Sequence, residues 1–185
     1  MLTQPLGDWS FDDLVEADLP LDPSRYEVVD GCLLVRPEMT VPHDSVRSYL
    51  ATWLDPRLPA GWRAHSELAV RLGTDGRRAD VGVVRANAAV WRQQVGHHPQ
   101  DIAMLGEVVS PSSRKTDRLF KPAEYAAAGI ATYWRIELEP EPLLVVHRLV
   151  GTTYEVAQQV TGRGRVDLPF PLEIDLPALL PPMFD

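Results

Sequence analysis

The chain has 185 residues, of which 45% are hydrophobic and 24% charged, values typical of one globular domain with a substantial core. No apolar run approaches the roughly 18–20 residues that span a membrane, and the N-terminus lacks a secretion-signal pattern, so we expect a cytoplasmic protein. The single Cys32 excludes an internal disulfide, and no Cys and His residues have zinc-site spacing.

Charge is unevenly distributed along the chain. The net charge is −8, yet residues 61–121 carry 10 Lys and Arg against 6 Asp and Glu, a balance of +4. The rest carries 8 against 20, a balance of −12. A basic working segment in an acidic protein suits an anionic substrate such as nucleic acid, although chance unevenness on a solvated surface explains the charge equally well.

The first third of the chain is predicted to form a short helix, a hairpin and a longer helix. Ser10 and Asp13 are spaced as a capping pair for the short helix. The Asp-Gly pair at positions 30–31 favours a tight turn between the apolar strands RYEVV and CLLVRP. An amphipathic helix from His43 to about Leu54 follows, with Arg47 on its outward face.

Three strands are predicted between residues 62 and 110. Alternating polarity indicates a half-buried strand from Trp62 to Leu72, a Thr-Asp-Gly turn leads into RRADVGVV, and IAMLGEVVS forms the third strand. Residues 86–100 lack a clear period. We expect a short helix around Ala88–Gln93 there, followed by an exposed turn at His97 and His98.

The remaining segments complete the predicted architecture. A loop, PSSRKTD, precedes a helix that ends at Gly129, and Pro122 must either begin or kink that helix. Three strands follow, Thr132–Leu138, Leu143–Leu149 and Thr153–Val160, and then a tail with one helical turn. This order predicts a single α/β domain with a mixed sheet flanked by helices, and no Gly-rich phosphate loop indicates a dinucleotide fold.

Two carboxylates interrupt apolar strands, Asp80 in RRADVGVV and Glu107 in IAMLGEVVS. An acid inside a strand is costly unless a partner neutralises it, and one divalent cation accepts two acids. Hard oxygen ligands favour Mg²⁺ or Mn²⁺ over zinc, with the carbonyl of Val108 as a third ligand. Such a cation serves phosphodiester hydrolysis by lowering the pKa of an attacking water. The alternative is a structural role for both acids, at exposed strand ends or in turns.

Lys121 is the predicted cationic partner of these acids. Lysine occurs only at positions 115 and 121, whereas arginine is the usual cation of this chain. A lysine supplies the compact ammonium that an attacking water needs nearby. In a helix, Asp117, Lys121 and Tyr125 share one face at four-residue spacing, a pattern that is also typical of a surface ion pair.

Seven blocks of sequence resemble the Uma-two family of bacterial endonucleases, over roughly residues 11–180. The blocks are RYEVVDG, PHDSVRSYLATWL, SELAVRL, RRADVGVV, GEVVSPSS, DRLFKPAEYAAAGI and YWRIE. That family is similar to the PD-(D/E)XK restriction nucleases. The resemblance therefore implies a restriction-endonuclease-like fold and a Mg²⁺- or Mn²⁺-dependent endonuclease with DNA as partner, and it leaves a homodimer open.

The resemblance also assigns residues. It makes Asp80 and Glu107 the catalytic acids, Lys121 a lysine displaced onto a helix, and Glu27 an auxiliary acid, although Glu27 also suits a hairpin surface. Gly106 replaces a usual branched residue and is expected to loosen its strand. The positions that match without an assigned role are His43, Ser110, Asp117 and Tyr125, and His43 is expected mainly to open its helix.

Two functions remain open from the sequence. The first is a metal-dependent endonuclease. The second is a non-catalytic binding or regulatory module of the same fold, which the net acidity and the missing Glu-x-Lys spacing favour.

Overall fold

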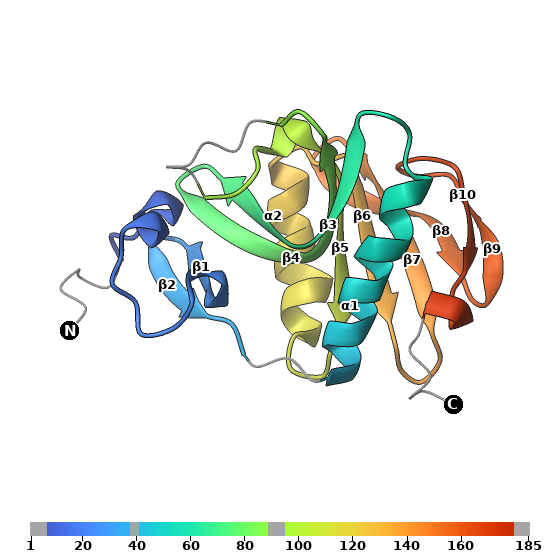
Figure 1. The fold of residues 1–185 in the computed structure, drawn as a ribbon, viewed down its shortest axis with the longest axis horizontal. Helices are drawn as coiled ribbons and strands as arrows, with labels where there is room; N and C mark the ends of the chain where they lie inside the picture. Colours follow the sequence, from blue (N-terminus) through green and yellow to red (C-terminus); the bar gives the residue numbers. More distant parts are fainter. Residues whose placement is uncertain (1–6, 38–40, 89–94, 180–185) are drawn as a thin grey trace.

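A large sheet forms the centre of the molecule. The computed structural model describes residues 7–37, 41–88 and 95–179, and within these ranges eight strands form one sheet while two more pair separately (Figure 1). The strands are β1 (Tyr26–Val29), β2 (Cys32–Val35), β3 (Trp62–Leu72), β4 (Asp75–Arg85), β5 (Ile102–Val109), β6 (Thr132–Glu137), β7 (Leu143–Val150), β8 (Thr153–Val160), β9 (Arg163–Val166) and β10 (Leu172–Asp175).

The large sheet is mixed. Its strand order is β2-β1-β4-β5-β6-β7-β8, and β3 pairs with β4 off this path. The pair β5 and β6 is parallel, because α2 forms the crossover between them, and the other pairs are antiparallel. The predicted α/β class with a mixed sheet flanked by helices is confirmed.

Two helices, α1 (Val41–Leu54) and α2 (Lys121–Ala127), cover opposite faces of the sheet (Figure 1). Neighbouring residues of β5 show this, because successive side chains of a strand point to opposite faces. Met104 packs in the core that contains Leu50 of α1, whereas Leu105 packs in the core that contains Tyr125 of α2. The central strand β5 is therefore buried on both faces.

The N-terminal predictions are confirmed in outline. Residues Phe11–Val15 form a 3-10 helix, and the backbone N–H of Ser10 donates to Asp13 at 2.7 Å. The strands β1 and β2 form the expected hairpin, with φ of 49° at Asp30 and 69° at Gly31. The other short helices are Pro23–Arg25, Asp55–Arg57, Pro99–Asp101 and Pro177–Leu179.

The helix around Pro122 continues from a preceding helical turn and does not start at the proline. Residues Thr116–Phe120 form a π-helical turn that runs directly into α2, so Pro122 lies in the first turn of the α-helical part. A π turn accommodates a residue that lacks a backbone N–H. Gly129 adopts φ of 82° at the predicted end.

Several other predictions need correction. Arg47 was expected to face away from the core, yet only 6% of it is exposed, because it pairs with acids beside the sheet. The small sheet of β9 and β10 was not foreseen. His97 is half-buried and its backbone bonds to β3, although His98 is exposed. The expected helix at Ala88–Gln93 lies almost entirely outside the described residues.

Gly106 does not loosen β5, contrary to the expectation from its sequence. Backbone pairing continues on both sides of it, to Val81 of β4 and to Trp134 of β6. A Cβ at Gly106 would lie 2.7 Å from Cγ1 of Val81. The glycine therefore allows close packing in the middle of the sheet.

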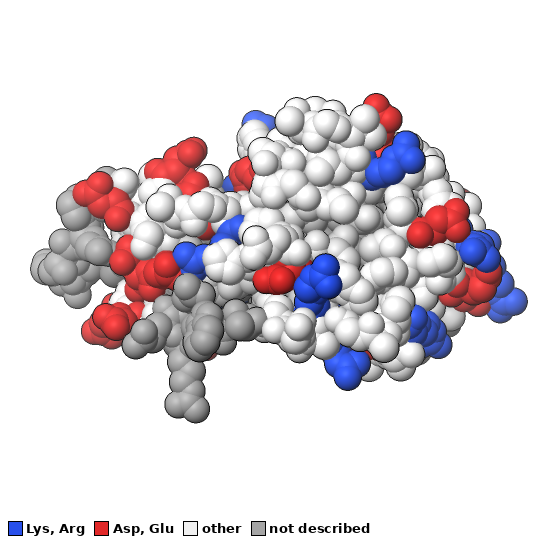
Figure 2. Space-filling model, turned by 90° about the horizontal axis from the view of Figure 1, so that it is seen from above, with Lys and Arg blue, Asp and Glu red and all other residues white. Residues whose placement is uncertain are grey.

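Negative charge gathers at one end of the molecule. Figure 2 shows acidic side chains over the part formed by residues 7–37. The exposed acids of this part are Asp8, Glu16, Asp18, Asp22 and Asp30. Among the described residues, no helix has the length and apolarity needed to cross a membrane.

Candidate functional site

The candidate site lies along one edge of β4, between two strands that pair with different parts of that edge. β1 pairs with β4 at Gly76, and β5 pairs with it from Val84 to Val81. Over the intervening buried residues, side chains and not a strand form hydrogen bonds to this edge. Glu27 accepts the N–H of Arg78 at 2.9 Å, and Lys121 donates to the carbonyl of Arg78 at 2.9 Å.

Asp80 stands where β4 and β5 separate. Its Oδ2 accepts the N–H of Val108 at 2.8 Å and lies 3.1 Å from Nε2 of His43. Its Oδ1 lies 3.5 Å from Arg36. Only 3% of the residue is exposed, so the prediction's alternative, an exposed strand-end acid, is wrong for Asp80.

These contacts keep Asp80 ionised. Burial alone would raise the pKa of Asp80, because it removes water from the carboxylate. The hydrogen bond and charge of His43, the charge of Lys121 and the Val108 amide outweigh burial and lower the pKa to about 2. In turn, burial lowers the pKa of His43, but Asp80, the Val108 backbone and the charge of Asp117 together raise it, so the net shift is upward.

Glu107 is buried among partners from α2. Lys121 donates to its Oε2 and Tyr125 donates to its Oε1, each at 2.9 Å. The residue is 1% exposed, which also excludes the strand-end alternative here. The stripe of Asp117, Lys121 and Tyr125, which are spaced four residues apart, is thus buried and is no surface ion pair.

Glu107 carries the least favourable charge of the site. Burial raises its pKa well above the usual value, Lys121 only partly offsets this, and the charges of Asp80 and Asp117 raise it further. Lys121 lies within 4 Å of three acids, Glu107, Glu27 and Asp117, and the pKa of its ammonium is raised despite burial. One ammonium therefore serves several carboxylates, and additional positive charge would stabilise the ionised site.

Glu27 links the hairpin to this site. Its second oxygen accepts a hydrogen bond from Arg77 at 3.0 Å, and Arg77 also donates two hydrogen bonds of 2.7 Å to Glu124. Burial raises the pKa of Glu27. The charge of Lys121, the Arg78 amide and the charges of Arg77 and Arg36 outweigh burial, so the pKa is lowered overall. Glu27 is 5% exposed and is thus no hairpin surface acid. Its metal or water contact stays a prediction.

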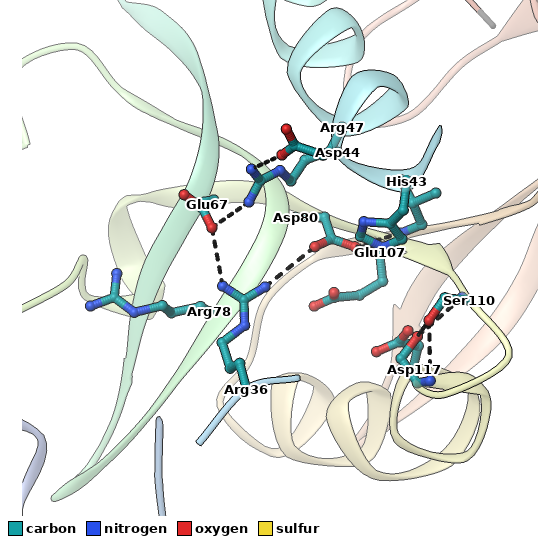
Figure 3. A network of polar contacts seen from close by, with 12 residues as sticks. Arg36, His43, Asp44, Arg47, Glu67, Arg78, Asp80, Glu107, Ser110 and Asp117 are labelled. Carbon is teal, nitrogen blue, oxygen red and sulfur yellow. Dashed lines mark hydrogen bonds and ion pairs between the residues drawn. The ribbon is translucent and has the colours of Figure 1, made fainter. Parts of the chain in front are cut away.

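A pocket of about 440 Å³ opens over these groups. Its charged residues come from β1, from the residue after β2, from β4 and β5, and from the π turn and α2, and the serine loop after β5 also lines it. Figure 3 shows Asp80, Glu107 and Asp117 around this space, with Arg36 and His43 on either side. The charged and imidazole groups that line it are Glu27, Arg36, His43, Arg77, Asp80, Glu107, Asp117 and Lys121.

The donor set fits a divalent cation. Asp80 and Glu107 come from the paired strands β4 and β5, line one pocket and carry hard oxygen atoms, while their binding of a metal ion stays a prediction. Across the described part of the chain, no three His, Cys, Asp or Glu side chains form a ready metal cluster. A cation would thus have two carboxylates and further oxygens from the backbone or water, the small ligand set that Mg²⁺ takes.

The structure brings four of the predicted site residues, Glu27, Asp80, Glu107 and Lys121, into one pocket. Val108 contacts Asp80 through its N–H, and the role of its carbonyl as a ligand stays a prediction. The structure also adds residues to which the sequence assigned no role at the site. His43 had been expected mainly to open its helix, but it contacts Asp80 directly. The others that contact the site acids are Arg36 and Arg77. The sequence held a signal for both arginines, because Arg36 directly follows the hairpin and Arg77 lies three residues before Asp80.

The chain matches one family of proteins and is similar to a solved structure. The model of the Uma2 family, described as "Putative restriction endonuclease", matches residues 12–180. The chain is also similar to the crystal structure of "a putative nuclease belonging to DUF820" from Anabaena variabilis, with a TM-score of 0.67 and 16% identity. That match covers 92% of this chain and 96% of the other, and at this identity it supports the fold alone. No curated protein matches the chain.

Proposed function

Because the chain belongs to the Uma2 family, we propose that it is an endonuclease that hydrolyses phosphodiester bonds in DNA with the help of Mg²⁺ or Mn²⁺. The observation that carries this proposal is the shared pocket of Asp80, Glu107 and Lys121. Two buried acids and an ammonium, placed beside an opening large enough for part of a nucleotide, form a site that a structural core does not need.

The two acids have different parts in this proposal. A bound divalent cation would neutralise phosphate oxygens and lower the pKa of the attacking water. Asp80 is already ionised, since its pKa is about 2, and its position is fixed by His43 and Val108. Glu107 is held by two hydrogen bonds but lacks sufficient positive charge, so it gains most from a cation.

Lys121 acts as a hydrogen-bond donor in this reaction. Its pKa is raised by the surrounding acids, so it remains an ammonium and is unsuited to act as a general base. Two of its N–H groups already donate hydrogen bonds, to Glu107 and to the carbonyl of Arg78. The third is available to orient the attacking water or to stabilise charge that develops on the phosphate.

The test is a cutting assay on purified protein. Single-stranded DNA, double-stranded DNA and RNA are incubated with Mg²⁺, with Mn²⁺ or with EDTA. We expect cation-dependent cutting of DNA by the wild type and at least a hundredfold slower cutting by Asp80→Ala and Glu107→Gln. Glu155→Gln, which changes an exposed acid on β8, is the matched control and should cut normally.

Two outcomes would speak against the proposal. Equal cutting by wild type and Asp80→Ala would reveal a contaminating nuclease. A wild type that binds DNA without cutting it under any of these conditions would favour the alternative, a binding module of the same fold.

A further inference from the structure

The three arginine and lysine side chains that line the pocket, among the described residues, differ in how firmly they are held. Arg77 makes three hydrogen bonds of 2.7–3.0 Å to Glu27 and Glu124, and Lys121 makes two of 2.9 Å. Arg36 makes one side-chain hydrogen bond, of 3.3 Å to Glu67. Its remaining acid contacts are longer, 3.5 Å to Asp80 and 3.9 Å to Glu27.

Arg36 is also the most accessible of the three. Its side chain is 12% exposed, against 6% for Arg77 and Lys121. Its backbone, by contrast, is fixed at the end of β2. The N–H of Arg36 donates to the carbonyl of Arg25 at 2.8 Å, and the Arg25 guanidinium donates to the carbonyl of Arg36 at 2.8 Å. A fixed backbone thus carries a loosely bonded guanidinium at the pocket wall.

The acid that bonds Arg36 has an unusual backbone. Glu67 lies in the middle of β3 with φ of 52°, a left-handed conformation that is uncommon for residues other than glycine. It falls between the ladder pairs Ser66–Val81 and Leu68–Ala79, which places it across from Asp80. Such conformations persist where surrounding contacts enforce them, and they gather at functional sites.

A chain of ion pairs fixes the Glu67 carboxylate. Figure 3 shows it between the guanidinium groups of Arg36 and Arg47, with Arg47 also paired to Asp44 of α1. Arg47 is buried, so this chain runs from α1 across β3 to the pocket. Glu67 therefore directs the Arg36 guanidinium toward Asp80 while leaving part of it without a strong bond.

We propose that Arg36 binds a phosphate group of the nucleic-acid substrate and that Glu67 is its positioning residue, an inference that rests on the proposed function. A guanidinium binds two phosphate oxygens through paired hydrogen bonds, which are stronger than its long contacts to Asp80 and Glu27. A phosphate that enters a pocket with four buried carboxylates also needs a cation near the opening. Arg36 supplies it.

Binding of two labelled oligonucleotides tests this inference by fluorescence anisotropy, with Ca²⁺ in place of Mg²⁺ to slow cutting. One strand has ordinary phosphodiesters and the other has neutral methylphosphonates. We expect Arg36→Ala to weaken binding of the phosphodiester strand about tenfold, the effect of one charge-assisted hydrogen bond. It should leave the weaker binding of the methylphosphonate strand unchanged. Arg36→Lys should recover part of the affinity.

Matched variants separate a phosphate contact from general effects. Arg63→Ala removes the same charge from an exposed side chain and should alter affinity less than twofold. Glu67→Gln alone should weaken binding of the phosphodiester strand. Added to Arg36→Ala it should have no further effect, because Glu67 acts through Arg36. Circular dichroism checks folding, and Arg36→Gln takes the place of Arg36→Ala if that variant does not fold.

Three results would overturn the inference. They are unchanged phosphodiester affinity in Arg36→Ala, an equal loss for both strands, or a wild type that binds neither strand. A wild type that binds the phosphodiester strand through Arg36 without cutting DNA would leave this inference standing while the proposed endonuclease function fails.

Discussion

Replacement of Lys121 by methionine tests the electrostatics of the buried site. Methionine preserves the length and much of the volume of the side chain but removes its charge. Glu107 then loses its nearest cation, and the carbonyl of Arg78 loses a 2.9 Å hydrogen bond. Breaking a buried ion pair on one side typically costs about 3–5 kcal/mol, because the remaining charge is uncompensated.

The loss of unfolding free energy in Lys121→Met should be larger at high pH than at low pH. The folded-state pKa of Glu107 already lies above its unfolded value, so ionising Glu107 reduces stability as pH rises from the unfolded pKa through the folded one. Without Lys121 that pKa rises further. At pH 8 we expect a loss of about 3–5 kcal/mol. At pH 5 Glu107 accepts a proton, and the expected loss of stability falls to about 1–2 kcal/mol, because only the carbonyl of Arg78 is left without its hydrogen bond.

Urea unfolding of wild type and Lys121→Met at pH 5 and pH 8 measures these losses. The matched control is Lys115→Met, since Lys115 is the only other lysine and lies exposed over the Phe120 ring. Its removal should cost less than about 0.5 kcal/mol at both pH values. Equal losses at the two pH values for Lys121→Met, or equal losses for the two lysines, would refute the proposed role of Lys121 in compensating Glu107.

Three further predictions concern stability. The pKa of Asp80 lies at about 2, below its unfolded value of 3.8, so the stability that its ionised form contributes is present above pH 3.8 and disappears as pH falls toward 2. In urea unfolding, the difference in unfolding free energy between wild type and Asp80→Asn should therefore shrink by about 2 kcal/mol over this pH range, and a constant difference would contradict this. Tyr125→Phe removes the hydrogen bond to Glu107 and should cost about 1 kcal/mol in the same assay, whereas an unchanged midpoint would show that the bond contributes nothing. Gly106→Ala should cost about 1–3 kcal/mol through the clash with Val81, and Val81→Ala in the same chain should restore part of it; additive losses would exclude the clash.

The sequence predicted the acids of the site because each interrupts an apolar run, a pattern that survives any local error in element boundaries. It also predicted the stripe of Asp117, Lys121 and Tyr125, since helical spacing places these side chains together. What it left open was whether the stripe faced water or the sheet. That choice depends on how α2 packs against β5, which is a tertiary contact and is invisible to a local pattern.

The errors share the same cause. Arg47 was expected on the outer face of α1 because a charged residue opposite an apolar stripe normally contacts water. The structure buries it, since Glu67 in a left-handed conformation presents a carboxylate to it. Likewise, Gly106 suggested a weak strand, but the fit against Val81 becomes apparent only when β4 and β5 are paired. Propensity describes one segment and cannot include these partners.

We propose that Asp80 and Glu107 jointly bind one divalent cation, and isothermal titration calorimetry with Mn²⁺ measures this on the wild type, Asp80→Asn and Glu107→Gln. We expect one binding site per chain in the wild type and loss of that binding in each variant. A wild type that shows no binding, or a Glu107→Gln protein that binds Mn²⁺ as the wild type does, would contradict it.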